Sequence, residues 1–92
     1  MGLSKNLNVG ALEAIAKDTV YQADSALIIT CYTTGSYMGI YADASNPPTT
    51  LVANDSSTAS IVSGSCAIIA AGEYYKLVTI GSSTGFFRRK LL

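Results

Sequence analysis

The sequence contains no histidine and no tryptophan, and its 92 residues include only two cysteines and two prolines. Without histidine, the chain cannot form a His-dependent catalytic triad, use an imidazole general base or bind a metal ion through imidazole. The two thiols, Cys31 and Cys66, are too few for a zinc site, which needs four ligands. We therefore expect no enzymatic activity, no metal site and no cofactor.

Charged residues are scarce as well, at 13% of the chain against 49% hydrophobic residues, a composition unlike that of disordered proteins. No apolar run approaches the ~20 residues that span a bilayer, and residues 1–10 lack the apolar core of a secretory signal. The net charge is zero, so nothing attracts the chain generally to nucleic acid or to anionic membranes. We expect neither partner.

Synthesis in a reducing cytoplasm follows from the missing signal, and it predicts that Cys31 and Cys66 are buried small apolar residues. A disulfide between them stays open as an alternative if their strands face each other.

The two signs of charge are separated along the chain. Residues 1–73 carry two lysines against all six acidic residues, whereas residues 74–92 carry four basic residues and no acid. Two interpretations stay open. Either the separation is a chance placement in a fold whose C-terminal end packs beside everything else, or Arg88, Arg89 and Lys90 form a basic strand that docks on an acidic surface of a neighbouring copy or partner.

β-Branched and aromatic residues dominate the chain from residue 19 onward, and turn-forming residues interrupt them at short intervals. The strand-like runs between these turns are Thr19–Ala23, Ala26–Thr33, Tyr37–Asp43, Thr49–Ala53, Thr58–Val62, Cys66–Ala70, Tyr74–Ile80 and Gly85–Leu92. About eight short strands at this spacing predict an all-β fold, a single small antiparallel β-sandwich or jelly-roll-like domain over residues 19–92.

Side-chain alternation predicts which faces of the strands are buried. Met38, Ile40 and Ala42 share one face of the run Tyr37–Asp43. The runs Leu27–Ile29 and Ala67–Ile69 are apolar on both faces, so we expect another subunit to cover one face of each.

The segment Gly81–Gly85 has the G-x-S-x-G pattern of a nucleophile elbow, but the chain lacks the histidine and the following helix that this mechanism needs. We expect a hairpin loop at Gly81–Gly85.

The sequence offers two further candidate sites, one for calcium and one for sugars. Asp43 with Ser45 and Asn46 could bind calcium, but Asx residues in turns usually bond their own backbone, and we favour that interpretation. The six tyrosines could stack on sugars, but strand and interface positions suit them better.

Residues 1–18 are predicted to form an N-terminal arm. Good helix formers gather at Ala11–Lys17, where a two-turn helix and an extended arm both stay open, since short helices are marginal alone. The polar segment before them reads as a flexible arm that orders against a partner. The apolar residues spaced through the arm are Leu3, Leu7, Val9, Leu12 and Ile15.

Two segments together resemble a known class of domain. Thr19–Ile29 places a tyrosine before an x-Ala-x-Ser pattern and an apolar run, and Gly72–Val78 contains Gly-x-Tyr-Tyr-Lys before a closing segment with the pair Phe86-Phe87. This order resembles small β-sandwich domains of tailed-bacteriophage virion proteins, namely capsid decoration (cement) proteins and tail-fibre or spike tips. The resemblance covers residues 19–92. The basic residues 88–90 depart from the pattern, in which a proline is common.

The resemblance implies a virion structural protein that forms a homotrimer and contacts a phage major capsid or tail protein. Our first hypothesis is a decoration protein that stabilises a particle by clamping neighbouring subunits, and the alternative is a fibre-tip module that binds a receptor glycan. Capsid and tail locations both stay open. The residues we expect at subunit contacts are Leu3, Leu7, Val9, Leu12 and Ile15 in the arm and Phe86, Phe87, Arg88, Arg89 and Lys90 in the last strand.

Overall fold

The computed structural model describes residues 10–56 and 62–91, and within these ranges it contains strands and turns but no helix. The six strands are β1 (Glu13–Ala14), β2 (Tyr21–Gln22), β3 (Leu27–Asp43), β4 (Leu51–Ser56), β5 (Val62–Ile69) and β6 (Tyr74–Lys90). Three of the sequence-predicted arm residues, Leu3, Leu7 and Val9, lie outside the described residues.

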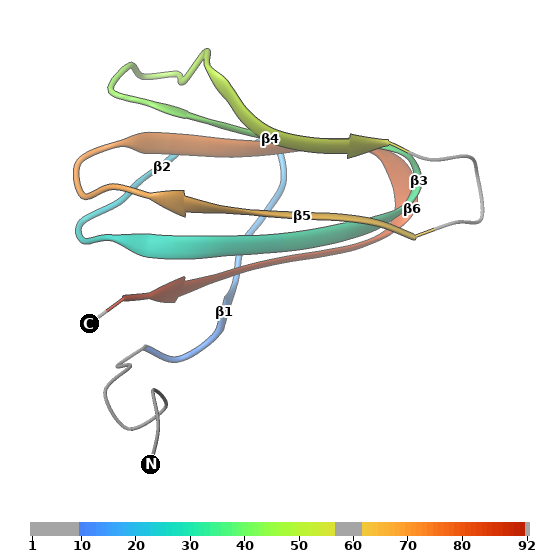
Figure 1. Ribbon diagram of the computed structural model, residues 1–92, viewed down its shortest axis with the longest axis horizontal. Helices are drawn as coiled ribbons and strands as arrows, with labels where there is room; N and C mark the ends of the chain where they lie inside the picture. Colours follow the sequence, from blue (N-terminus) through green and yellow to red (C-terminus); the bar gives the residue numbers. More distant parts are fainter. Residues whose placement is uncertain (1–9, 57–61, 92) are drawn as a thin grey trace.

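The fold is organised by two long strands, β3 and β6, which pair antiparallel from Leu27 opposite Lys90 to Asp43 opposite Tyr74. Both strands bend at the same end of the molecule, where Gly35 pairs with Gly81 (Figure 1). The register shifts on both sides of Gly35. Such irregularities increase the local bend of a strand, and glycine tolerates them because it has no Cβ.

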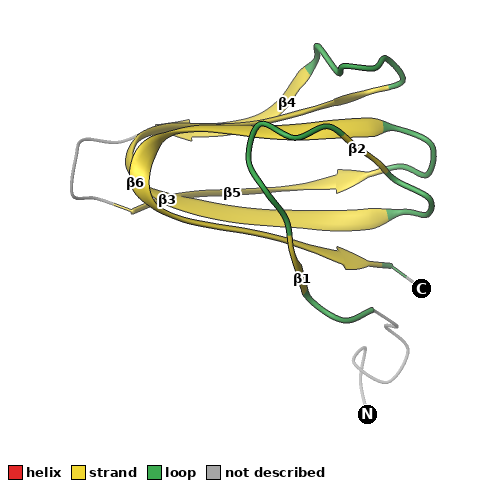
Figure 2. Cartoon of the chain, turned by 180° about the vertical axis from the view of Figure 1, so that it is seen from behind, coloured by secondary structure: helices red, strands yellow, loops and turns green. Residues whose placement is uncertain are grey.

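The bend folds one hydrogen-bonded sheet into two layers of four strand segments each. Layer A has the order β1, residues 82–90 of β6, residues 27–34 of β3, and β5. Layer B has the order β2, residues 74–81 of β6, residues 37–43 of β3, and β4. The short strands β1 and β2 lie on one side of the molecule, along β6 (Figure 2). This arrangement confirms the predicted small antiparallel β-sandwich.

Three predicted turns are wrong in detail. Gly35–Ser36 and Gly81–Gly85 lie within β3 and β6, and Ser63–Ser65 lies within β5. The expected hairpin loop at Gly81–Gly85 is therefore a bend inside a continuous strand. A strand that changes layer must bend without ending, and small residues permit this as readily as they permit a hairpin.

The N-terminal segment settles one open alternative. Residues 11–17 are extended rather than helical, and β1 pairs with the end of β6 through Glu13 opposite Arg88. The backbone N–H of Ile15 donates to the carbonyl of Phe86, so the strand-like pairing continues beyond β1.

Apolar side chains from both layers fill the interior of the sandwich. The predicted inward face of residues 37–43 is confirmed, because Met38, Ile40 and Ala42 are all buried. The buried core is completed by Ala23, Leu27, Ile29, Cys31, Ile69, Tyr75, Leu77 and Phe86. Alternation then leaves the intervening residues of each strand on the outer faces.

One buried polar group generates a stability prediction. Thr33 on β3 is 0% exposed, and its Oγ1 has no hydrogen-bond partner in the described part of the chain. An unsatisfied buried hydroxyl is destabilising, whereas valine has nearly the same shape. Thr33→Val should raise the free energy of unfolding by about 1 kcal/mol in urea denaturation. Thr30→Val, at an exposed position of the same strand, is the matched control and should change it far less; equal effects would contradict this account.

Candidate functional site

The side chains of the basic C-terminal strand point alternately to the two faces of layer A. Phe86 is buried in the core, and Arg88 and Lys90 follow it on the same, inward side. Phe87 and Arg89 are half-buried on the outer side. The five residues predicted at this contact therefore do not form one surface: Phe87 and Arg89 lie on the outer side, whereas Phe86, Arg88 and Lys90 lie on the inward side.

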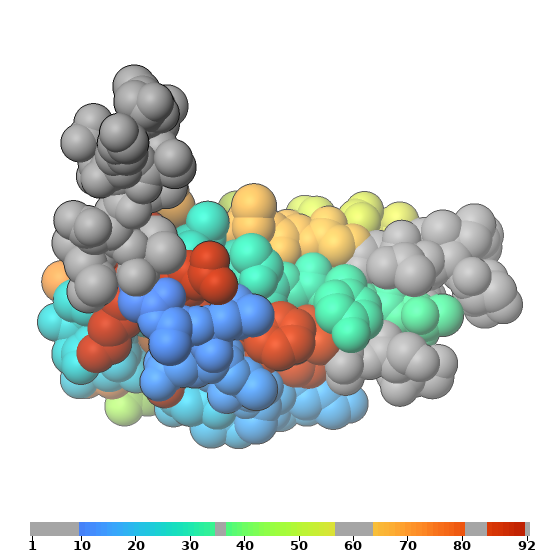
Figure 3. Space-filling model, turned by 90° about the horizontal axis from the view of Figure 1, so that it is seen from below, coloured from blue at the N-terminus to red at the C-terminus, as the bar shows by residue number. Residues whose placement is uncertain are grey.

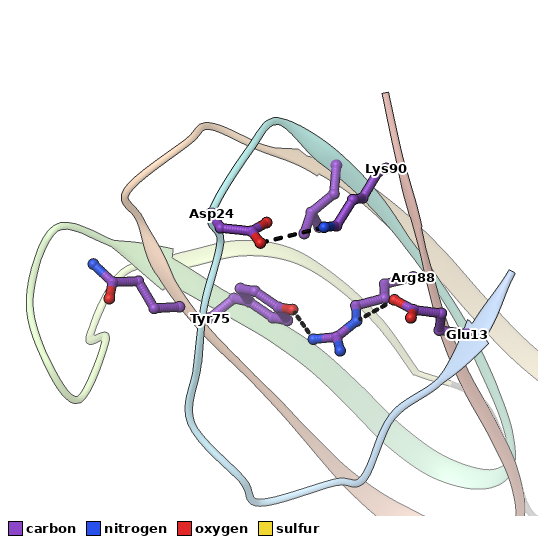
Figure 4. A pocket seen from close by; sticks show the side chains of 7 residues that line it. Glu13, Asp24, Tyr75, Arg88 and Lys90 are labelled. Carbon is purple, nitrogen blue, oxygen red and sulfur yellow. Dashed lines mark hydrogen bonds and ion pairs between the residues drawn. The ribbon is translucent and has the colours of Figure 1, made fainter. Parts of the chain in front are cut away.

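Arg88 contacts side chains of β1, β2 and β6. Its Nη1 donates a hydrogen bond of 2.7 Å to the Tyr75 hydroxyl, and its Nε donates one of 3.0 Å to Glu13 (Figure 4). The guanidinium carbon also lies 5.1 Å from the centroid of the Tyr21 ring, which stacks on Tyr75. The hydrogen bond to Tyr75 is the main cause that raises the pKa of Arg88, and Glu13 adds to it. This cluster ties β1 and β2 to β6.

Lys90 makes a second and more exposed ion pair. Its Nζ lies 3.2 Å from Asp24 Oδ2, and this hydrogen bond lowers the pKa of the Asp24 carboxyl. The two pairs line a pocket of about 170 Å³ together with Gln22 and Leu27. Arg88 and Lys90 are thus matched by acids of their own chain. The acids of the same chain account for these two residues, and docking on a neighbour stays a prediction for Arg89.

The outer side of layer A is apolar and open. Leu12, Ile28, Thr30 and Arg89 line a groove of about 290 Å³ there. The Nε of Arg89 is buried and has no hydrogen-bond partner among the described residues. A buried donor without an acceptor is costly, and an acceptor brought by another molecule would satisfy it.

Exposed apolar side chains extend this surface across all four strand segments. Leu12 is 53% exposed, Ile68 is 70% exposed and Tyr32 is 45% exposed. Arg89, Ile28 and Ile68 occupy one row of the register. We call the outer side of layer A the outer face, and it includes Leu12, Ile28, Tyr32, Ile68 and Arg89. Figure 3 looks onto it, with β1 in blue, β6 in red, β3 in teal and β5 in gold. The apolar runs at 27–29 and 67–69 place Ile28 and Ile68 on this face, and its coverage by another subunit stays a prediction.

The two described residues of the predicted arm contact differ in environment. Leu12 lies on the outer face, as a contact residue should. Ile15 instead packs against the core of its own chain. Ile15 is therefore explained by folding alone.

The two cysteines are free and their side chains point to opposite faces. Their strands are neighbours, with Cys31 opposite Ser65 and Thr30 opposite Cys66, so adjacent residues in the register face opposite ways. Cys31 is buried, and burial raises its pKa to about 11. Cys66 is exposed, so its expected burial is wrong, and the open alternative of a disulfide is not realised.

The Asp43 loop confirms the preferred interpretation of its Asx residue. Oδ1 accepts a hydrogen bond from the N–H of Ser45, and Oδ2 accepts bonds from the N–H groups and hydroxyls of Thr49 and Thr50. These bonds, led by that from Thr49, hold the pKa of the Asp43 carboxyl well below its usual value. The carboxylate therefore closes its own loop.

Within residues 10–56 and 62–91, no three histidine, cysteine, aspartate or glutamate side chains gather as metal ligands. The same ranges contain no helix of the length and apolarity needed to cross a bilayer. The chain matches no protein-family model, and no significant match exists among characterised proteins or solved structures.

The Arg88 cluster predicts unequal costs for removing the two inward cations. Arg88→Met leaves the hydroxyl of Tyr75, a residue that is 0% exposed, without its partner, and should lower the free energy of unfolding by about 1–3 kcal/mol. Lys90→Met removes a largely exposed ion pair and should cost less than about 0.5 kcal/mol. Urea denaturation of both variants measures the difference, and equal losses would show that the Tyr75 contact contributes nothing.

Asp43 predicts a pH dependence of stability. Its pKa is lowered on folding, so its contribution is fully present above the unfolded value of 3.8 and is lost as the pH falls below it. The melting temperature of the wild type should therefore exceed that of Asp43→Asn at pH 6, and the gap should narrow as the pH is lowered toward 2.5. A gap that stays constant over this range would mean that the ionised carboxylate does not hold the loop.

Proposed function

We propose that the protein is a non-enzymatic structural subunit of a tailed-phage particle, which stabilises the particle by joining neighbouring subunits. The observation that carries the proposal is the outer face, an open apolar surface across a whole layer of the sandwich. Exposed Leu12, Tyr32 and Ile68 would lose water at a subunit contact, and burial of apolar area is the main driving force of association.

The composition of the outer face suits a protein partner. Tyrosine and arginine are enriched where interfaces are buried, and Arg89 offers an unsatisfied donor among apolar neighbours. A carboxylate or carbonyl of the partner would complete this donor and orient the contact. Association of three copies, as in the virion domains that residues 19–92 resemble, is part of the proposal.

The particle itself enters the proposal through that resemblance, and capsid and tail locations remain alternatives within it. A glycan-binding tip finds less support. Among the six tyrosines, only Tyr32 has more than about a third of its surface exposed, so a row of rings for sugar stacking is not formed in this chain.

Particle purification tests the proposal directly. Phage particles are produced in cells infected with the phage that encodes this chain, and they are purified by density-gradient centrifugation. Mass spectrometry of the purified particles should detect the chain. Ile68→Asp should reduce the amount bound at least tenfold, because it places a charge on the outer face. Val52→Asp, an exposed position on layer B, is the matched control and should bind like the wild type.

Recovery of the chain only from the soluble fraction would overturn the proposal. Equal retention of the Ile68→Asp and Val52→Asp variants would show instead that the outer face is not the contact.

A further inference from the structure

The open edge of layer A is the backbone of β5. This strand is the last of its layer and pairs with β3 on one side. The N–H of Gly64 donates to Asp55 Oδ2 on β4, so it points away from β3. Because N–H and C=O groups alternate in direction along an antiparallel strand, Cys66 and Ile68 also direct their backbone groups outward. No described strand pairs with them on that side.

Beyond Gly64, whose N–H is bonded to Asp55 of β4, the β5 edge lacks the devices that normally protect such edges. From Ser56 to Gly72 the sequence contains no charged residue and no proline. Natural edge strands are blunted by lysine, proline, bulges or shortness, because a bare edge pairs with other strands. The edge strand of layer B differs, since β4 is shorter and carries Asp55. Ile68 adds an exposed apolar side chain beside the open edge.

The N-terminal arm has the sequence of a strand that could fill this edge. In residues 3–9, Leu3, Leu7 and Val9 occupy odd positions together with Lys5, and Ser4, Asn6 and Asn8 occupy even positions. A period of two places the apolar side chains on one face of an extended segment. Seven residues, 3–9, are close in length to the eight residues of β5.

Geometry favours the arm of a second copy. The N–H of Gly10 donates to the carbonyl of Lys90 at 2.7 Å, so the arm begins beside β6, at the edge of layer A opposite β5. About three strand spacings of ~4.8 Å separate the two edges, and an arm pairing within its own chain would have to cross the layer. Pairing between copies requires no such crossing, because the β5 edge of a second copy can lie beside the point at which the arm begins.

Charge is compatible with this pairing. Residues 3–9 of the arm carry Lys5 and no acid, and the uncharged β5 edge is flanked in sequence by Asp55 and Glu73. No like charges would oppose each other along the added strand, and the lysine would face a weakly acidic neighbourhood.

We propose that residues 3–9 of one copy add as a strand to the β5 edge of a second copy, beside Cys66 and Ile68. The contact is heterologous, since two different surfaces meet, and such contacts form a ring when the rotation between copies closes and an open filament when it does not. It deepens the proposed function, on which it rests, by naming the segments through which copies join.

Light scattering after size-exclusion chromatography tests the contact on four purified proteins. The wild type should have a mass of about three times 9.6 kDa, and deletion of residues 2–9 should give a monomer. Cys66→Pro removes one outward N–H without removing a bond to β3, and it should also give a monomer. Val52→Pro, on the β4 edge, is the matched control and should assemble like the wild type.

Mixing the two monomeric variants separates this pairing from others. The Cys66→Pro chain supplies an arm and the deleted chain supplies an intact edge, so the mixture should form a one-to-one dimer. Circular dichroism should show both variants folded, and Ile68→Lys replaces Cys66→Pro if the proline unfolds the chain.

An arm-deleted protein that still assembles would overturn the proposal, because the copies would then join through a surface other than residues 3–9. A monomeric wild type at millimolar concentration would overturn it as well. Neither result bears on whether the chain is found in purified particles, so the two proposals fail separately.

Discussion

The continuous pairing of β3 with β6 is the constraint on which the rest of the structure depends. The two strands stay paired through both layers, and they bend together where Gly35 meets Gly81 and the register shifts. Because the bent pair already supplies the two central segments of each layer, the other strands need only cover its flanks. This explains why β1 and β2 can be two residues long. It also makes β4 and β5 the two substantial edge strands of the molecule.

The same pairing decides what the C-terminal strand can do. Its register with β3 turns Phe86 into the core and Arg88 toward Tyr75, so half of the strand is used to hold its own fold. Phe87 and Arg89 remain on the outer face with Leu12 and Ile28. The surface offered to a partner is therefore a face of layer A together with its β5 edge, and the acids at Glu13 and Asp24 neutralise the inward cations.

The sequence predicts the fold class and the buried face of residues 37–43, because β-branched composition and alternation are local signals. It does not predict the two bends, since Gly and Ser allow a hairpin and a bend equally, and only the long-range pairing of β3 with β6 selects between them. For the same reason Cys66 was expected inside. The run around Cys66 is apolar on both faces, so its sequence does not indicate which face is buried. The pairing of β5 with β3 decides which face meets the core. The inward direction of Arg88 depends on Tyr75, which lies in another layer.

Hydrogen exchange of single backbone amides, followed by NMR, tests the central claim most directly: that β5 is an open edge which assembly fills. In the protein lacking residues 2–9, the amides of Ala67 and Ile69 should exchange slowly, since they bond to β3, and those of Cys66 and Ile68 should exchange rapidly. In the full-length protein, Cys66 and Ile68 should slow at least tenfold. Rapid exchange of these two amides in both proteins would contradict the account.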